Sequence, residues 1–98
     1  MIWLKSSGNY TEFEWDENKN HLNIIKHGVS FYEAQHAFFD PCRVIAEDLE
    51  HSQSEKRYYC FGKVEKYVMT VRFIFRDKFI RIIGAGYWRK GINYYEKE

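Results

Sequence analysis

The sequence predicts one α+β domain, in which two N-terminal helices pack on a curved antiparallel sheet of about four strands, followed by a C-terminal tail or helix. The clearest helix signals lie in residues 16–41, where two capping patterns follow one another. Alternation of apolar and polar residues, which is typical of strands, dominates residues 43–85. The chain 1–98 is 45% hydrophobic and contains one proline, which is the composition of a single folded domain with one core.

The N-terminal part of the chain predicts one short strand and one helix. Residues 1–11 show no clear period and predict a loose extension, after which residues 13–15 alternate like a short strand. Asp16 can cap the first amides of a helix over residues 17–27, and Gly28 supplies the left-handed residue that ends it.

A second helix is predicted directly after the first. Ser30 and Glu33 have the spacing of a capping box, and Asp40-Pro41 ends the helix. The apolar spacing predicts the faces that pack on the sheet: Leu22, Ile24 and Ile25 in the first helix, and Phe31, Ala34, Ala37 and Phe38 in the second.

The remaining elements are predicted to be strands, over residues 43–49, 56–64, 67–75 and 79–85. Short connections, such as the one at Asp77-Lys78, favour antiparallel pairing of consecutive strands. Residues 87–98 form either a helix weakened by Gly91 or an extended arm.

The net charge of +1 conceals two halves of opposite sign. Residues 1–50 carry four Lys or Arg and nine Asp or Glu, whereas residues 51–98 carry eleven and five, so the halves have net charges of −5 and +6. This asymmetry predicts that the second half builds a surface for a polyanion or for an acidic partner. The alternative is that solvated charges segregated by chance.

Several function classes are not indicated. Cys42 and Cys60 are expected to be small core residues in a reducing compartment, since neither stands at zinc-ligand or disulfide-framework spacing. The four histidines are scattered, so no metal site is predicted. No apolar run approaches about 18 residues, which predicts a cytoplasmic protein without a membrane span.

The candidate ligand-binding residues are cations on rigid strands with aromatic residues between them, a combination that suits single-stranded RNA. Arg72 and Arg76 share one strand face, and Arg81 rises through a partly apolar surface. His51 follows an acidic turn and is a candidate proton carrier. The other candidate cations are Arg57, Lys78, Arg89 and Lys90, and the candidate stacking residues are Trp88 and Tyr94. For each arginine, the alternative is a solvated charge or a structural ion pair.

These residues also carry a family resemblance that covers roughly residues 13–96. The chain resembles the BrnT family of toxins through Phe13-Glu-Trp-Asp16, Lys19, Asn23, Lys26-His27-Gly28-Val29-Ser30-Phe31, Glu33-Ala34, Phe38 and Asp40-Pro41. The likeness continues through His51, Glu55, Arg57, Gly62, Arg81-Ile82-Ile83 and Ala85.

The resemblance implies a RelE-like fold and a ribonuclease that needs no metal or other cofactor. In such an enzyme the ribose 2′-OH attacks the adjacent phosphate, and the protein supplies cations and a proton carrier. Arg57 and Arg81 carry over by position, and His51 is the candidate proton carrier. The implied partners are an RNA substrate and a BrnA-like ribbon-helix-helix antitoxin, with operator DNA bound only through the antitoxin.

The chain departs from the family pattern near its last strand. Many members read Arg-Ile-Ile-Ser-Ala-Arg followed by a strongly basic helix, whereas residues 81–86 here read Arg-Ile-Ile-Gly-Ala-Gly. Trp88, Arg89 and Tyr94 are candidates to replace the missing groups. The alternatives to a ribonuclease are a catalytically weak or inactive module that binds the antitoxin as a co-repressor, and a non-catalytic RNA-binding domain.

Overall fold

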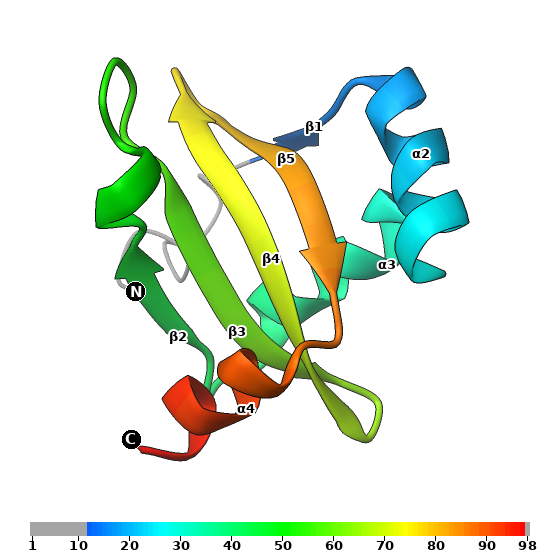
Figure 1. Cartoon of the computed structure of the whole chain (residues 1–98), viewed down its shortest axis with the longest axis vertical. Helices are drawn as coiled ribbons and strands as arrows, with labels where there is room; N and C mark the ends of the chain where they lie inside the picture. Colours follow the sequence, from blue (N-terminus) through cyan, green and yellow to red (C-terminus); the bar gives the residue numbers. More distant parts are fainter. Residues whose placement is uncertain (1–11, 98) are drawn as a thin grey trace.

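The computed structural model describes residues 12–97, which form a five-stranded mixed sheet with helices on both faces (Figure 1). The strand order is β1-β5-β4-β3-β2. The strands are β1 (Glu12–Glu14), β2 (Val44–Glu47), β3 (Tyr58–Val64), β4 (Tyr67–Arg76) and β5 (Phe79–Gly86). The four predicted strands are confirmed as consecutive antiparallel neighbours. The prediction of a purely antiparallel sheet is wrong, because β1 adds a fifth strand that pairs parallel with β5.

The helices lie on both faces and at one edge of the sheet (Figure 1). One face carries α3 (Phe31–Ala34) and the 3₁₀ helix η1 (Gln35–Phe39), and the other carries α4 (Arg89–Glu96) against β3 and β4. Helix α2 (Glu17–His27) lies beside β5. A further 3₁₀ turn, η2 (Leu49–His51), follows β2. The tail is therefore a helix rather than an extended arm, so the described chain has more than two helices. The predicted extension over residues 1–11 lies outside the described residues.

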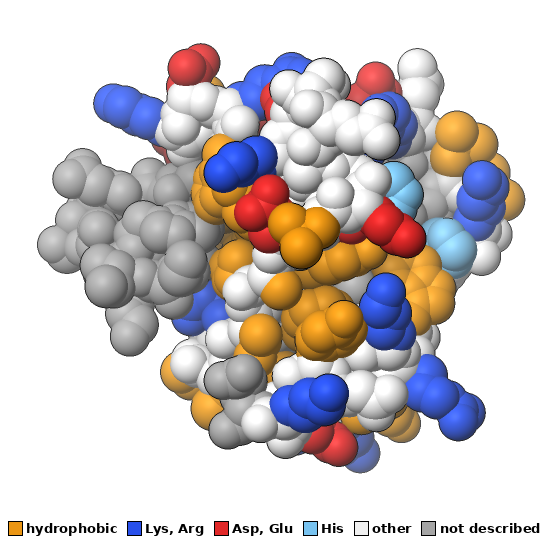
Figure 2. All heavy atoms as spheres, turned by 60° about the vertical axis from the view of Figure 1, so that its left-hand side comes forward, with side chains coloured by type: hydrophobic (Ala, Val, Ile, Leu, Met, Phe, Trp, Pro, Cys, Tyr) orange, Lys and Arg blue, Asp and Glu red, His pale blue; other side chains and the backbone are white. Residues whose placement is uncertain are grey.

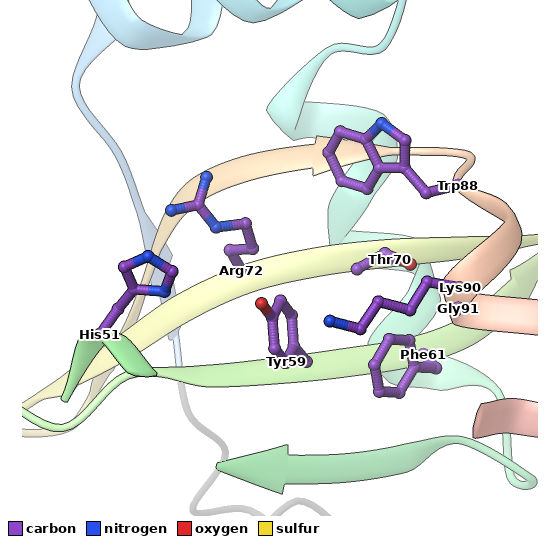
Figure 3. Close-up of a pocket in the computed structure, with 8 residues that line it drawn as sticks. All are labelled: His51, Tyr59, Phe61, Thr70, Arg72, Trp88, Lys90 and Gly91. Carbon is purple, nitrogen blue, oxygen red and sulfur yellow. The ribbon is translucent and has the colours of Figure 1, made fainter. Parts of the chain in front are cut away.

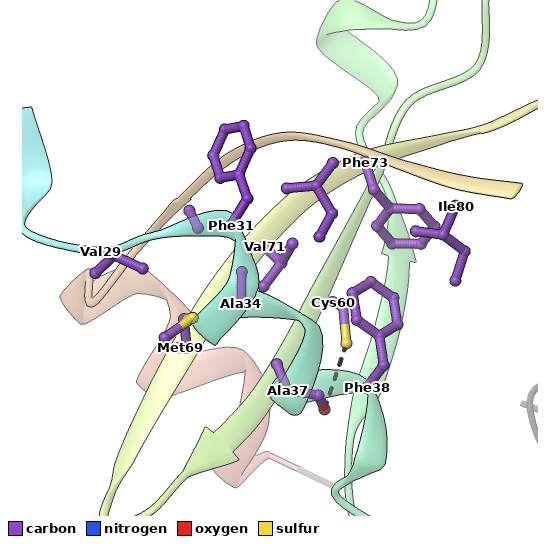
Figure 4. Close-up of a cluster of buried hydrophobic side chains, with 12 residues drawn as sticks. Val29, Phe31, Ala34, Ala37, Phe38, Cys60, Met69, Val71, Phe73 and Ile80 are labelled. Carbon is purple, nitrogen blue, oxygen red and sulfur yellow. Dashed lines mark hydrogen bonds between the residues drawn. The ribbon is translucent and has the colours of Figure 1, made fainter. Parts of the chain in front are cut away.

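The core lies between the sheet and the α3–η1 segment (Figure 4). Here the prediction for the second helix is confirmed, because its four apolar residues are all buried. Gly62 of β3 permits this close packing, since a Cβ atom at that position would collide with the carbonyl group of Ala37. The same carbonyl accepts a hydrogen bond from Cys60 Sγ at 3.8 Å. Burial raises the pKa of the Cys60 thiol, which makes it an unreactive core group.

The prediction that Cys42 is a core residue is wrong, because Cys42 is exposed. It follows Asp40-Pro41, where the chain leaves the helical layer and turns at the surface before β2.

Helix α2 begins at Asp16 and ends at Gly28 as predicted, but its predicted apolar face does not pack on the core. Leu22 is 53% exposed and Ile25 is 67% exposed. The buried residue of the helix is Asn23, whose Nδ2 donates to the carbonyls of Val29 at 2.8 Å and Ala85 at 2.9 Å. Its Oδ1 accepts from the amide of Ala85 at 3.3 Å. The buried backbone groups near the end of β5 need hydrogen-bond partners. The side of α2 that carries Asn23 therefore faces β5, and the apolar side of the helix remains exposed.

Helix α4 is fixed to the other face by close packing and by one short hydrogen bond. Gly91 lies against the hydroxyl of Thr70, where a side chain would collide. Tyr94 stacks on Phe61 with ring centroids 5.0 Å apart and an interplanar angle of 5°. The hydroxyl of Tyr95 donates to Asp40 Oδ2 at 2.6 Å, and this bond, with burial, raises the pKa of Tyr95 to about 12. No helix in residues 12–97 has the length and apolar character needed to cross a membrane.

We expect Asn23→Ala to lower the free energy of unfolding by about 2–3 kcal/mol, because it leaves three buried backbone groups without partners. Leu22→Ala should lower it by less than about 0.5 kcal/mol, since Leu22 is exposed. Urea denaturation measures both values. A larger loss for Leu22→Ala than for Asn23→Ala would contradict this account of α2.

We expect Tyr95→Phe to lower stability by about 1 kcal/mol at neutral pH, because Asp40 loses a hydrogen-bond donor. The raised pKa means that folding favours the neutral phenol. The contribution of the Tyr95 hydrogen bond to the free energy of unfolding is therefore complete below pH 10 and is lost as pH rises toward about 12. Thermal melts between pH 8 and 12 should fall more steeply for the wild type than for Tyr95→Phe. Parallel curves would show that this bond does not link α4 to folding.

Candidate functional site

A cavity of about 410 Å³ lies on the α4 side of the sheet, opposite the core (Figure 3). We call this cavity the groove. The strands contribute Tyr59, Phe61, Thr70 and Arg72, and the segments beyond them contribute His51, Trp88, Lys90 and Gly91. His51 stands at one end of the groove and Trp88 at the other, with Arg72 between them (Figure 3).

The floor of the groove follows from the pairing of β3 with β4. Tyr59 lies opposite Arg72, and Phe61 lies opposite Thr70. Because side chains alternate along a strand, these four share one face, while the intervening residues Cys60 and Val71 enter the core. Two pairs of directly opposed side chains therefore form one continuous surface of aromatic and polar groups.

Two glycines of β5, Gly84 and Gly86, lie directly beneath groove side chains. A Cβ atom on Gly84 would stand 3.2 Å from the guanidinium of Arg72, and one on Gly86 would stand 2.6 Å from the indole of Trp88. Gly84 also pairs with Arg72 in the register of β4 and β5. The absence of a side chain at these two positions thus gives Arg72 and Trp88 room to lie against β5.

His51 is held by a buried carboxylate that the sequence did not single out. Its Nδ1 lies 2.8 Å from Asp48 Oδ2, with the His51 side chain 53% exposed and that of Asp48 only 6% exposed. This contact occupies Nδ1 and leaves Nε2 for a ligand. The loop around it is also tied, because the amide of Asp48 donates to the carbonyl of Arg57 at 2.7 Å. A buried carboxylate that orients an exposed imidazole is a proton-transfer arrangement.

The charge state of Asp48 supports this arrangement. Burial raises the pKa of this carboxyl, but hydrogen bonding and charge from His51, with a hydrogen bond from Tyr59, outweigh burial and hold the pKa below its ordinary value. Burial and the negative charge of Asp48 raise the pKa of Tyr59. Asp48 is therefore an anion at neutral pH, and it connects His51 to the floor of the groove. The spacing of three residues between Asp48 and His51, across an acidic turn, was the signal that could have identified the pair.

Glu50 belongs to the same turn. One ligand atom each from Asp48, Glu50 and His51 lies within 4.8 Å of the others, a proximity that the scattered histidines of the sequence did not indicate. The hydrogen bond between Asp48 and His51 already accounts for two of the three groups.

The groove includes two of the predicted cations, Arg72 and Lys90. The ammonium of Lys90 lies 5.9 Å from the centre of the Tyr59 ring, so it stands above the floor of the groove. Both positive charges therefore lie between His51 and Trp88, where an anionic ligand would be held (Figure 3).

The other predicted cations lie outside the groove. Arg81 forms an ion pair with Glu14 at 3.2 Å, and Arg76 forms one with Glu55 at 3.5 Å. Arg57 lines a separate cavity of about 250 Å³, which also touches His51. Lys78 lies in the turn between β4 and β5, and Arg89 is exposed in the first turn of α4.

The two candidate stacking residues differ in their surroundings. Trp88 is half-buried in the wall of the groove, whereas Tyr94 is outside it and stacks on the back of Phe61. A space-filling view turned by 60° from Figure 1 shows an exposed hydrophobic patch bordered by basic and acidic side chains (Figure 2). In the groove, aromatic surface and positive charge are adjacent, because the ammonium of Lys90 stands above the ring of Tyr59.

A comparison with known protein families gives one match over most of the chain. The family model described as "Ribonuclease toxin, BrnT, of type II toxin-antitoxin system" matches residues 15–91. This range includes every residue that lines the groove. None of the curated proteins compared with the chain matches it.

Proposed function

Because the chain belongs to the BrnT family of ribonuclease toxins of type II toxin–antitoxin systems, we propose that it cleaves RNA in the groove. The observation that carries this proposal is the hydrogen bond between His51 and Asp48 at the end of a cavity that contains Arg72 and Lys90. The site thus combines an oriented proton carrier with two cations on one surface.

RNA supplies its own nucleophile, so the protein must move protons and stabilise charge. His51 Nε2 takes the proton of a ribose 2′-OH, whose oxygen attacks the adjacent phosphorus. The bond from phosphorus to the 5′-oxygen breaks, and this oxygen leaves with a proton from water. The products are a 2′,3′-cyclic phosphate and a 5′-hydroxyl. Asp48 stabilises the imidazolium that forms on His51.

Arg72 and Lys90 stabilise the extra negative charge that the phosphate acquires during the attack. The first turn of α4 adds to this positive field, since Trp88, Lys90 and Gly91 belong to the helix N-terminus and also line the groove. The hydroxyl of Thr70 is buried beneath Gly91 without a hydrogen-bond partner among the described residues, so Thr70 supports the floor and does not contact the phosphate. The two cations and the helix N-terminus provide the charge stabilisation that a metal would otherwise provide, and we therefore propose a metal-independent reaction.

The remaining predicted residues are assigned to the approach of the RNA. Arg57 lies beside His51 and is placed to contact the phosphate that flanks the reacting one. Lys78 and Arg89 are exposed cations that bind more distant phosphates, and a similar role for Arg76 requires that Glu55 release it. A catalytic role for Arg81, which the family resemblance implies, requires that Glu14 release it.

We further propose that the protein inhibits growth by acting on cytoplasmic RNA and that a BrnA-like ribbon-helix-helix antitoxin neutralises it. Operator DNA would be bound only through that antitoxin. We also propose that the domain has a RelE-like fold.

A second candidate function is an inactive module that binds its antitoxin as a co-repressor. The absence of the family arginine at Gly86 and the pairing of Arg81 with Glu14 favour it, since both reduce the positive charge available for catalysis. A non-catalytic RNA-binding domain is the third, and RNA binding that depends strongly on salt without cleavage would identify it.

We expect the purified protein to cleave RNA in the presence of EDTA and to leave 2′,3′-cyclic phosphate ends. His51→Gln and Arg72→Met should each lower the rate by about 100-fold or more, as expected for loss of a proton carrier or of a charge-stabilising group. Asp48→Asn should lower it less than His51→Gln. Cleavage of a labelled RNA, followed on denaturing gels, measures these rates.

His21→Gln is the matched control, because His21 is an exposed histidine on α2 and does not line the groove. Its rate should equal that of the wild type. Undiminished cleavage by His51→Gln would refute the assigned chemistry. If the folded wild-type protein binds an antitoxin but leaves RNA intact, the co-repressor function is correct instead.

A further inference from the structure

Trp88 is a residue whose position the fold alone does not explain. It directly follows β5 and is the N-cap residue of α4, where its side chain makes no capping hydrogen bond. Small polar residues are preferred at such positions because they can accept from the first amides of the helix. Trp88 also belongs to the groove rather than to the core on the other face of the sheet. Its large ring is therefore needed neither for capping nor for the core.

The surroundings of Trp88 hold the indole at the groove wall. Gly86 leaves space for it, since a Cβ atom there would stand only 2.6 Å from the ring. His27, at the end of α2, lies in edge-to-face contact with it at a centroid distance of 5.0 Å. Two elements that are distant in sequence thus set the position of one aromatic ring in the groove.

The spacing between Trp88 and Arg72 suits a nucleic-acid strand. The guanidinium of Arg72 lies against Gly84 and the indole of Trp88 lies against Gly86. These glycines are two residues apart on β5, which corresponds to about 7 Å. A phosphate held by Arg72 and Lys90 would therefore place the base of a neighbouring nucleotide at Trp88.

Tyr94, the other candidate, is less suited to this role. It stacks in parallel on Phe61, so one of its faces is already covered by the protein, and it does not line the groove. Of the two predicted stacking residues, the geometry selects Trp88.

We propose that Trp88 forms a nucleobase-stacking subsite at the end of the groove opposite His51, and that it prefers a purine. Stacking depends on ring overlap rather than on hydrogen bonds to the base edge, so the larger purine ring is favoured. The subsite sets the register of the RNA relative to His51 and so determines which phosphodiester bond is presented. This inference rests on the proposed function, because the same groove must hold the RNA.

Binding of a non-cleavable strand tests the subsite separately from catalysis. The probes are fluorescently labelled 2′-deoxy oligonucleotides of eight nucleotides that carry at one internal position a purine, a pyrimidine or an abasic sugar. Fluorescence anisotropy measures their dissociation constants. For the wild type, the purine probe should bind about tenfold more tightly than the abasic probe, with the pyrimidine probe between them.

In Trp88→Ala this preference for a base should disappear, whereas Trp88→Phe should retain most of it. Gly86→Ala should also weaken it, because the added methyl group displaces the indole. Gly86→Ala keeps Trp88 itself, so it tests the subsite if Trp88→Ala fails to fold. Trp15→Phe is the matched control, since Trp15 packs against Phe31 on the other side of the sheet.

If replacing the purine by an abasic sugar weakens binding by the same factor in the wild type and in Trp88→Ala, the subsite is overturned, even if RNA is cleaved normally. If that loss of affinity depends on Trp88 but RNA is not cleaved, the subsite is supported and the proposed catalysis is overturned. If none of the probes binds to the wild type, the subsite is overturned, whereas the proposed catalysis is still decided by the cleavage of RNA.

Discussion

The register between β3 and β4 is the constraint on which the rest of the structure depends. It pairs Cys60 with Val71, which both enter the core, and Tyr59 with Arg72, which both enter the groove. A slip by one residue would exchange the two faces, burying a guanidinium and exposing the apolar residues that hold α3 and η1. The hydrophobic effect on one face therefore determines which side chains meet on the other. The candidate site is a consequence of core packing as much as of its own residues.

Close approach of other groups to the sheet depends on glycines at four places. Gly62 admits the carbonyl of Ala37 on the core face, and Gly91 brings α4 against Thr70 on the groove face. Gly84 and Gly86 admit side chains rather than backbone, namely those of Arg72 and Trp88. The space that a side chain would occupy at Gly84 and Gly86 is thus filled by two side chains of the groove.

Local rules were sufficient to predict much of the fold. The cap residues Asp16 and Ser30 and the alternation over residues 67–75 all identified elements correctly, because the physical causes act within a few residues. The parallel pairing of β1 could not be predicted in this way, since its partner lies more than sixty residues away and three residues contain too little pattern. The prediction that the apolar face of α2 packs on the sheet failed for a related reason. Asn23 is buried because of the backbone groups of Ala85, which no helical periodicity reveals.

The residue types of the candidate site could be predicted from the sequence, but not the full set of residues that meet there. His51, Arg72, Lys90 and Trp88 were recognised from residue type and meet in the groove, whereas Asp48 was overlooked because a carboxylate in an acidic turn resembles a solvated surface charge. The net charge of the basic half also overstated the positive charge available for a ligand. Arg76 and Arg81 are paired with Glu55 and Glu14, so their charges are largely compensated locally.

What distinguishes the groove is therefore the arrangement of a few charges of opposite sign rather than a high total charge. The anionic Asp48 is buried behind His51, while Arg72 and Lys90 lie in the cavity beside Tyr59. An approaching phosphate meets the cations first, and the carboxylate acts only through the imidazole that covers it. This separation allows one small site to attract an anion and still stabilise a protonated histidine, two requirements that would conflict if all the charges were equally exposed. The aromatic floor separates the carboxylate of Asp48 from the two cations. The strand register that builds this floor is the one that builds the core.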